Sequence, residues 1–418
     1  MTDVIIVGAG HAGLAASACL QKYGIEHCVL ERGQIGESWR DQRWDSFCMN
    51  TPNWTLNLPD KPYAGDDPDG FMTKDGFIDY LVGYADAQRL PVRANITVTH
   101  ARYSGVQWHL QTSEGPIQTR VLLVATSTYQ HPNIPESGNL ASSIVTISAS
   151  DYRHPDTLPP GRVMVIGSAQ SGMQIVDDLL DAGREVLLST GKAGRVPRRY
   201  RGRDLNYWYD KLGLMDRRAS DLADPRRRWS GQPQISGWDG GHTVSLQKFH
   251  RKGVRLLGRY TYCDETVFHF GQDLRENIAA ADRHSAEFCR SIDHYIEAGD
   301  LTFPSDVGDD PMHDPIDDLT TIPEPDRIDL INEGISAVIW ATGFRFDYSW
   351  VEANAFDKFG YPKTDRGEAP APGLFFLGMN YLHTRKSGIV YGITDDANHV
   401  AARIRNYLKA DWKSLAKA

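Results

Sequence analysis

The chain has 418 residues, more than one ordinary hydrophobic core requires, so we expect two or three domains. With 41% hydrophobic residues, 24% charged residues and a net charge of −9, it reads as a globular protein without general affinity for nucleic acid or acidic membranes. No apolar run reaches the ~18 residues of a membrane span, and a strand expected from residue 3 leaves no room for a signal peptide. We therefore expect a cytoplasmic monomer or homodimer that acts on a small molecule.

A glycine-rich turn follows the apolar run at residues 4–7. Its glycines, Gly8, Gly10 and Gly13, have the spacing of a Rossmann unit, in which a strand turns into a helix. In such a turn Gly8 permits the tight bend, and Gly10 lets the backbone approach a pyrophosphate. Gly13 lets the helix pack against the strand. We predict a dinucleotide site here, with a helix that ends near Gly24.

A carboxylate follows this turn at the position that a bound ribose requires. The short strand expected at residues 28–30 ends on Glu31, 18 residues after Gly13. An acid about 20 residues after the last glycine typically binds a ribose 2′-hydroxyl. The next loop leads to Trp39 and Arg40, an aromatic side chain and a cation that suit a flavin ring and its phosphates. This context favours FAD, although the loop by itself is equally consistent with a structural turn.

A second turn of the same type, residues 167–172, begins 159 residues after the first and follows the apolar run at 163–166. Ala169 stands where the first turn has its middle glycine, which costs little as long as φ stays negative. We expect a helix over 173–180 that closes at Gly183, and a strand over 185–190. Two turns predict two dinucleotides held face to face, and hence electron transfer between them.

The second turn lacks the carboxylate of the first. The residue 18 positions after Gly172 is Thr190. Ser189, Lys192 and Arg195 surround it and offer hydroxyl and cationic donors, which suit a 2′-phosphate. We therefore predict NADPH, with NADH as the alternative. The arginine-rich stretch 195–203 is either a solvated loop or a lining for phosphates or for an anionic substrate.

The fold class that these patterns predict is α/β, with two Rossmann-like domains, one nested in the other. The FAD domain would comprise residues 1–155 and 326–418, and the NADPH domain residues 156–325, with a helical insertion over about 195–320. Strand-like runs at 95–100, 106–112 and 116–126 predict a small antiparallel layer. The five cysteines form no Cys-x-x-Cys motif and no zinc-type cluster with histidines, so we expect no redox dithiol and no metal.

On these residues the chain resembles the class B flavin-dependent monooxygenases, which include the flavin-containing monooxygenases, the plant YUCCA-type enzymes and a bacterial branch. The resemblance covers nearly the whole chain. It rests on both glycine turns, on Gly36 with Trp39 and Arg40, and on the segments 49–52, 56–59, 338–344 and 373–388. The last of these segments matches the bacterial branch best.

The resemblance implies an FAD domain of the glutathione-reductase type. It implies that NADPH reduces the flavin, that O2 then forms a C4a-(hydro)peroxide, and that a small molecule is oxygenated at nitrogen, sulfur or an activated carbon. Asn50 would lie beside the flavin ring and help to hold the oxygenated intermediate. The last helix, opening over 392–397, would point its N-terminus at the flavin. The cofactor-binding residues that we predict are Gly8, Gly10, His11, Ala12, Gly13, Glu31, Arg32, Ser38, Trp39, Arg40, Val98, Ala125, Thr126, Gly167, Ser168, Ala169, Gln170, Ser171, Gly172, Ser189, Thr190, Lys192, Arg195, Thr342, Gly343, Gly378 and Thr394.

Departures from the family pattern keep other functions open. The family's identifying stretch, Phe-x-Gly-x-x-x-His-x-x-x-Tyr, survives only as Tyr152, because Ser142, Ile144 and Ser148 occupy its other three positions. In the family this stretch couples NADP⁺ retention to domain motion. Ser127 also replaces the glycine of the first Ala-Thr-Gly. The alternatives are an FAD-dependent NAD(P)H oxidase or reductase without stable oxygen transfer, and a dinucleotide-binding regulator that is not an enzyme.

Overall fold

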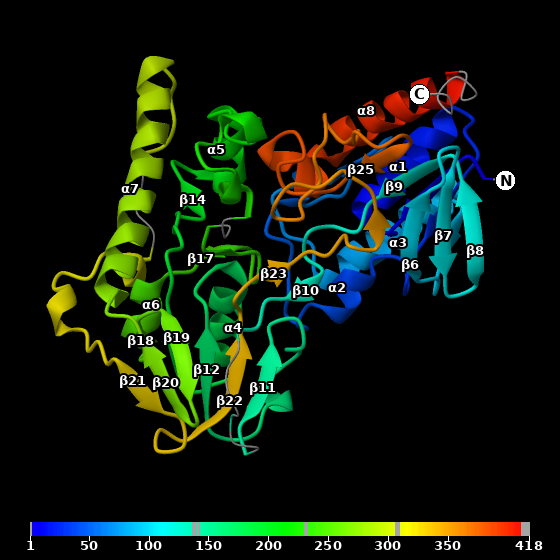
Figure 1. The fold of residues 1–418 in the computed structure, drawn as a ribbon. Helices are drawn as coiled ribbons and strands as arrows, with labels where there is room; N and C mark the ends of the chain where they lie inside the picture. Colours follow the sequence, from blue (N-terminus) through cyan, green and yellow to red (C-terminus); the bar gives the residue numbers. More distant parts are fainter. Residues whose placement is uncertain (1, 136–139, 141–142, 230–232, 306–309, 411–418) are drawn as a thin grey trace.

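The computed structural model describes residues 2–135, 140, 143–229, 233–305 and 310–410, so the predicted counterpart at Ser142 lies outside the described residues. The chain forms two bodies, each built around a five-stranded parallel sheet (Figure 1). The first sheet has the order β25 (Leu374–Phe376), β9 (Val121–Val124), β1 (Val4–Val7), β2 (His27–Leu30), β5 (Val92–Arg93). The second has the order β11 (Val145–Ser148), β22 (Ile335–Trp340), β12 (Arg162–Ile166), β13 (Val186–Ser189), β18 (Arg255–Leu257). This architecture confirms the predicted fold class.

Helices and a small sheet surround the first parallel sheet. The helices are α1 (His11–Lys22), α2 (Glu37–Asp41), α3 (Lys74–Gln88) and α8 (Val390–Lys409). The small sheet has the order β24 (Val351–Glu352), β6 (Val98–Tyr103), β7 (Trp108–Thr112), β8 (Gly115–Thr119), and lies below the main sheet in Figure 1 while α8 lies above it. The predicted antiparallel layer is therefore confirmed.

The second body carries α4 (Gln170–Asp181), α5 (Leu205–Lys211), α6 (Leu246–Arg251) and the long helix α7 (Leu274–Ala298). Its antiparallel elements are β19 (Tyr260–Asp264), β20 (Val267–Phe270) and β21 (Arg327–Asp329), with the hairpins β14–β15 (Arg199–Tyr200, Arg203–Asp204) and β16–β17 (Ile235–Ser236, His242–Thr243). A further hairpin, β3–β4 (Asn57–Leu58, Lys61–Pro62), belongs to the first body. Short 3-10 helices span Asn53–Thr55, Pro155–Thr157, Ala219–Asp221, Pro225–Trp229, Pro311–His313, Leu319–Thr321 and Arg385–Gly388.

The predicted domain borders at 155/156 and 325/326 are wrong. Strand β11 precedes the first border and β22 follows the second, yet β22 pairs in parallel with both β11 and β12 of the second sheet. The chain instead crosses between the bodies where β10 (His131–Pro132) pairs antiparallel with β23 (Phe344–Arg345). The prediction missed this because it began the second unit at its glycine-turn strand, whereas two flanking strands complete the sheet.

The predicted helical insertion over about 195–320 is also wrong in extent. Strand β18 lies inside this range and pairs with β13 as the edge strand of the second sheet, and β20 pairs with β21 beyond it. A shorter stretch lies outside the parallel sheet, and it contains the hairpins β14–β15 and β16–β17 and helix α5. The prediction of a helical insertion did not include the edge strand that precedes α7.

The two glycine turns have the same backbone geometry. The Gly8 N–H donates to Leu30 O at 2.8 Å, and the Gly167 N–H donates to Ser189 O at 3.0 Å. Gly10 has φ −79° and ψ −177°, and Ala169 has φ −77° and ψ −177°. Alanine therefore fits the second turn without strain. The matching bonds also align Thr190 with Glu31, which confirms the register that we inferred by counting.

Close backbone packing requires two of the glycines in each turn. A Cβ on Gly13 would lie 1.9 Å from Gly8 O, and one on Gly172 would lie 1.8 Å from Gly167 O. A Cβ on Gly8 would lie 2.6 Å from Ala125 O, at the end of β9. Each turn is thus held between its own helix and the neighbouring strand.

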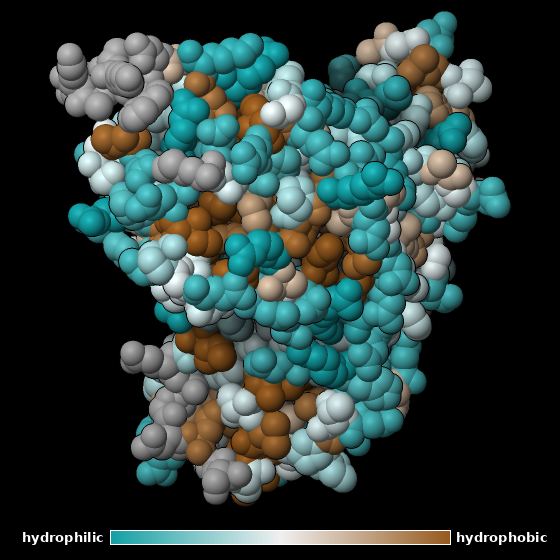
Figure 2. All heavy atoms as spheres, turned by 90° about the vertical axis from the view of Figure 1, so that its right-hand side faces the viewer, coloured by the Kyte–Doolittle hydropathy of each residue, from teal (hydrophilic) through white to brown (hydrophobic). Residues whose placement is uncertain are grey.

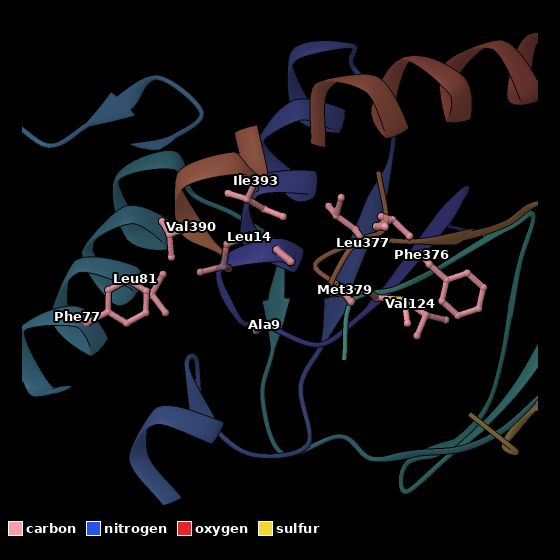
Figure 3. Close-up of a cluster of buried hydrophobic side chains, with 14 of the residues drawn as sticks. Ala9, Leu14, Phe77, Leu81, Val124, Phe376, Leu377, Met379, Val390 and Ile393 are labelled. Carbon is pink, nitrogen blue, oxygen red and sulfur yellow. The ribbon is translucent and has the colours of Figure 1, made fainter. Parts of the chain in front are cut away.

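Hydrophobic side chains pack beneath the first turn. Figure 3 shows Leu14 of α1, Phe77 and Leu81 of α3, and Val390 and Ile393 of α8 converging there, and all five are buried. This contact brings the start of α8 to the turn from the far end of the chain. On the face shown in Figure 2, hydrophobic side chains reach the surface in separate groups among hydrophilic ones. No helix of the described residues has the length and hydropathy needed to cross a membrane.

The turn geometry predicts opposite outcomes for two glycines that are three residues apart. Gly13→Ala should lower the stability of the protein without cofactor by about 1–3 kcal/mol, because its Cβ overlaps a backbone oxygen that cannot move away. Gly10→Ala is the matched control, since a Cβ there meets no atom within 4 Å and φ is already negative. Thermal unfolding of the FAD-free proteins measures both, and equal midpoints would contradict this account of the turn.

Candidate active site

Four helices begin without a side-chain cap at the places where we predicted cofactor contacts. These are α1 at Gly10, α2 at Gly36, α4 at Ala169 and α8 at Ile389, and α7 begins without one elsewhere. Helices α3, α5 and α6, by contrast, are capped by Thr73, Asp204 and Ser245. Free N–H groups at a helix start, together with the helix dipole, favour an anion. The open space that a Cβ on Gly10 would enter fits the approach of a pyrophosphate to α1.

Glu31 is positioned for a nucleotide at the end of β2. Its carboxylate is buried and accepts from the N–H of Ala9 at 2.7 Å and of Gly33 at 3.1 Å, one bond to each oxygen. These bonds hold the side chain against the turn while each oxygen keeps a lone pair for a ribose hydroxyl. Of the other residues predicted to bind the cofactor, Arg32 is exposed, and Ser38 and Val98 are half-buried. The Glu31 carboxylate fits the ribose of the adenosine half of FAD.

His11 is the first residue of α1. Its Nε2 is buried and has no hydrogen-bond partner among the described residues, and burial lowers the pKa of the imidazole to about 4. The side chain is therefore neutral at neutral pH. An unpartnered buried nitrogen at an uncapped helix start is consistent with contact to a bound nucleotide, as predicted.

The loop before α2 lies on the first turn, because the N–H of Gly36 donates to Ala9 O at 3.1 Å. Trp39 packs edge-on against Phe77 with ring centroids 4.8 Å apart. Arg40 is exposed and bonds to the carbonyl of Ile35.

Sequence reasoning missed Arg43, whose guanidinium lies 5.2 Å from the ring centroid of Trp39 and 5.5 Å from that of Phe47. Burial lowers its pKa to about 10, and no carboxylate among the described residues pairs with it. The sequence did offer one indication of Arg43, because it is a further arginine three residues after the predicted Arg40.

The second nucleotide site replaces the carboxylate with hydroxyl groups. The N–H of Gly191 donates to Ser168 Oγ at 3.0 Å, a link between turn and strand end like that of Ala9 to Glu31. Ser189 and Thr190 are buried, and their hydroxyls donate to the carbonyls of Gly258 and Leu257. A phosphate would have to replace these bonds to use the two hydroxyls. Gln170 and Ser171, half-buried, begin α4.

The two predicted cations, Arg195 and Lys192, differ in exposure and in whether a carboxylate pairs with them. Arg195 is buried and forms an ion pair with Asp282, with Nη2 2.7 Å from the carboxylate. Lys192 is exposed and has no ion-pair partner among the described residues. Lys192 is therefore the better placed of the two to meet a 2′-phosphate.

Residues from the end of the chain join the first site. A Cβ on Gly378 would lie 2.5 Å from the Cβ of Ala12, so the segment after β25 lies against the start of α1. Thr394 of α8 donates its hydroxyl to the carbonyl of Asn57. Tertiary packing thus brings both predicted residues to the first turn and to the loop that follows Asn50.

The remaining predicted residues form the crossing between the bodies. Thr342 donates its hydroxyl to Asn133 O, and Tyr348 donates to Ser127 O at 2.6 Å. Ser127 has φ +61° where Gly343 of the second crossing has φ +88°. A left-handed backbone conformation costs a serine on the order of 1 kcal/mol, so the chain is locally strained at Ser127. Ala125 and Thr126 lead into this segment from β9.

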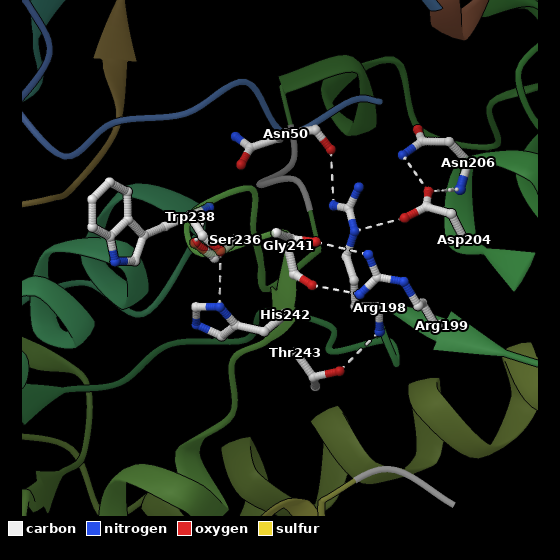
Figure 4. A network of polar contacts seen from close by, with 11 residues as sticks. Asn50, Arg198, Arg199, Asp204, Asn206, Ser236, Trp238, Gly241, His242 and Thr243 are labelled. Atoms are coloured by element: carbon white, nitrogen blue, oxygen red, sulfur yellow. Dashed lines mark hydrogen bonds and ion pairs between the residues drawn. The ribbon is translucent and has the colours of Figure 1, made fainter. Parts of the chain in front are cut away.

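Asn50 lies where the two bodies meet (Figure 4). Its backbone carbonyl accepts from Nη1 of Arg198 at 2.9 Å, and Arg198 Nε bonds Asp204 at 2.7 Å. The guanidinium is 4.0 Å from the ring centroid of Phe71 and is almost fully buried; burial lowers its pKa to about 10 against the opposing effect of Asp204. Arg198 belongs to the arginine-rich stretch, and neither prediction for that stretch anticipated a buried contact with Asn50.

A second contact between the bodies involves Tyr152, the residue retained from the family's identifying stretch. Its hydroxyl donates to Asp178 Oδ2 on α4 at 2.5 Å, and Ser46 donates to the other oxygen at 2.6 Å. Burial and the bond to Asp178 raise the pKa of the phenol well above its usual range. The side chain of Ser148, the last residue of β11, donates to Asp151 Oδ2 at 2.6 Å. Asp178 of α4 therefore receives Tyr152 on one oxygen and Ser46, from the loop before Asn50, on the other.

The chain is similar to flavin- and pyridine-nucleotide-dependent enzymes. The profile of the pyridine nucleotide-disulphide oxidoreductase family matches residues 5–208. A CzcO-like oxidoreductase of Geobacillus kaustophilus is 29% identical over 97% of this chain and 99% of its own length. Indole-3-pyruvate monooxygenase YUCCA1 of Oryza sativa subsp. japonica is 31% identical over 43% of this chain and 45% of its own. The solved flavin-containing monooxygenase of Stenotrophomonas maltophilia has a TM-score of 0.60 at 18% identity, covering 98% of this chain and 100% of that one.

Both glycine turns and the acid after the first agree with these similarities, and the five cysteines are free. The fold has a glycine turn at the start of α1 and another at the start of α4, and Asn50 of the first body bonds side chains of the second. The chain is an FAD- and NAD(P)H-dependent oxidoreductase that is similar in sequence and fold to flavin monooxygenases.

Proposed function

We propose that this protein is an NADPH-dependent monooxygenase that places one oxygen atom of O2 on nitrogen, sulfur or an activated carbon of a small molecule. The observation that supports the proposal is the position of Asn50 at the contact between the two bodies, where Arg198 of the second body bonds its carbonyl. Oxygen transfer needs a hydrogen-bond donor beside the flavin and a site closed to water. The reduced thiols are in keeping with work in the cytoplasm.

When bound, FAD supplies the redox chemistry, namely the uptake of a hydride and the activation of O2. The residues of this chain bind, orient and enclose it. Glu31 would hold the adenosine ribose, and the uncapped start of α1 would hold the pyrophosphate. The uncapped start of α8 would stabilise negative charge on the reduced ring. Asn50 would donate from its amide to the oxygen that is to be transferred.

Preference for NADPH follows from the difference between the two strand ends. Glu31 would repel a 2′-phosphate, and Thr190, its counterpart in the second body, carries no charge. Lys192, two residues later, supplies a positive charge that no carboxylate of the described chain neutralises. The second site therefore favours the phosphorylated dinucleotide.

Replacement of Asn50 tests the proposed role directly. Asn50→Ala should still bind FAD and oxidise NADPH, but should release more H2O2 for each NADPH consumed, because the oxygen loses its hydrogen-bond donor. Asn53→Ala is the matched control in the same loop, since its amide donates to Asp67 O, so it should lower stability and leave the ratio unchanged. The measurement is H2O2 and NADPH in the same assay.

Two results would contradict the proposal. One is an unchanged ratio in Asn50→Ala. The other is immediate return of the reduced wild-type flavin to its oxidised spectrum on mixing with O2 and NADPH in a stopped-flow spectrometer, which would identify an oxidase or a reductase instead.

A charge change tests the choice of dinucleotide. The wild-type protein should show the higher kcat/KM with NADPH, and Lys192→Ala should raise KM for NADPH about tenfold with little effect on NADH, because a tenfold change corresponds to one charged contact of ~1.4 kcal/mol. Lys252→Ala is the control, because Lys252 is also exposed but precedes β18 and so lies at the opposite edge of the sheet. Equal effects on NADPH and NADH would exclude Lys192 from phosphate recognition.

A further inference from the structure

The amide of Asn50 is bonded to a side chain of the other body. Gln174, in the second turn of α4, donates from Nε2 to Asn50 Oδ1 at 2.7 Å. The same Nε2 donates to the backbone carbonyl of Ile235, also at 2.7 Å. Gln174 is buried, so no solvent competes for these two bonds.

The second bond determines the orientation of both amides. A backbone carbonyl such as that of Ile235 can only accept, so the atom of Gln174 that faces it must be the NH2 group. That group has two hydrogens, and the bond to Asn50 uses the second one. The atom of Asn50 that meets it is therefore the acceptor Oδ1, and Nδ2 is left with no acceptor among the described residues.

The backbone of Asn50 is fixed from the same side. Nη1 of Arg198 bonds its carbonyl, and a Cβ on Gly237 would lie 2.0 Å from the carbonyl of the preceding residue, Met49. The loop of the second body between β16 and β17 thus lies directly against the Asn50 loop. The backbone and the side chain of Asn50 are therefore both bonded to residues of the second body.

We propose that Gln174 is a positioning residue that turns the Asn50 amide so that its Nδ2 donor, and not its Oδ1 acceptor, faces the oxygen held at the flavin. The inference rests on the proposed function. An oxygenated flavin presents an oxygen that accepts hydrogen bonds, and a reversed amide would place lone pairs against it. Because Gln174 lies on α4, the donor is correctly set only while the two bodies keep this arrangement. Protection of the oxygen is thereby coupled to the position of the NADPH domain in a chain that retains little of the family's identifying stretch.

Gln174→Glu is the decisive variant. A carboxylate only accepts, so it gives up the bond to the Ile235 carbonyl, draws the NH2 of Asn50 toward itself and turns the Asn50 acceptor toward the flavin. We expect the oxygenated flavin to decay at least tenfold faster in the stopped-flow spectrometer, with FAD affinity and the rate of flavin reduction by NADPH unchanged. Asn50→Asp is the complementary variant, because its carboxylate keeps the bond from Gln174 but has no donor, and it should show the same fast decay.

A double variant separates positioning from a general structural effect. In an Asn50→Ala background there is no amide to orient, so adding Gln174→Glu should not shorten the lifetime further. A readout without cofactor is the thermal unfolding of Asn50→Ala, Gln174→Met and the pair of changes combined. The midpoint shifts should be non-additive if the two side chains bond each other.

The outcomes distinguish the two proposals. If Asn50→Ala shortens the lifetime and Gln174→Glu does not, or if Gln174→Glu shortens it further in the Asn50→Ala background, the positioning role is wrong and the proposed function stands. If the wild-type protein shows no oxygenated flavin, or Asn50→Ala leaves its lifetime unchanged, the proposed function fails and the positioning role fails with it.

Discussion

Contact between bare backbone atoms at the two glycine turns is the constraint on which both nucleotide sites depend. The start of α1 lies against Gly8 O and the start of α4 against Gly167 O, with no space for a Cβ at Gly13 or Gly172. Only this close approach lets a helix begin directly at the end of its strand, with its first N–H groups pointing out of the sheet. Any side chain at these positions would move the helix start away from the site.

The same backbone geometry serves two unlike sites because the difference lies in side chains at the strand ends. Glu31 and Thr190 occupy equivalent positions, and each site ties its turn to its strand, by carboxylate in one case and by the Ser168 hydroxyl in the other. The Glu31 carboxylate leaves a charged acceptor at the first site, whereas the Ser168 hydroxyl brings no charge to the second. A middle alanine is tolerated in the second turn because φ at Ala169 is as negative as at Gly10.

The region between the two sites depends on contacts that cross from one body to the other. Arg198 and Gln174 hold Asn50, and Tyr152 and Ser46 meet on Asp178. Several of these groups are buried and polar, so each is costly unless it is paired. Such a junction is specific in its geometry and sensitive to how the two bodies are arranged.

Local spacing was enough to predict the α/β class, both turns, the acid at Glu31, the small antiparallel layer and the register that aligns Thr190 with it. These features depend on residues within about 25 positions of one another, where strand and helix periods act directly. The domain borders, the partners of β11, β18 and β22, and the contacts of Asn50 were set by segments far apart in the chain. Strand partners are chosen by packing of whole sheets, and a buried arginine such as Arg198 looks in sequence like a solvated one, because only the fold shows which cation meets a carbonyl from the other body.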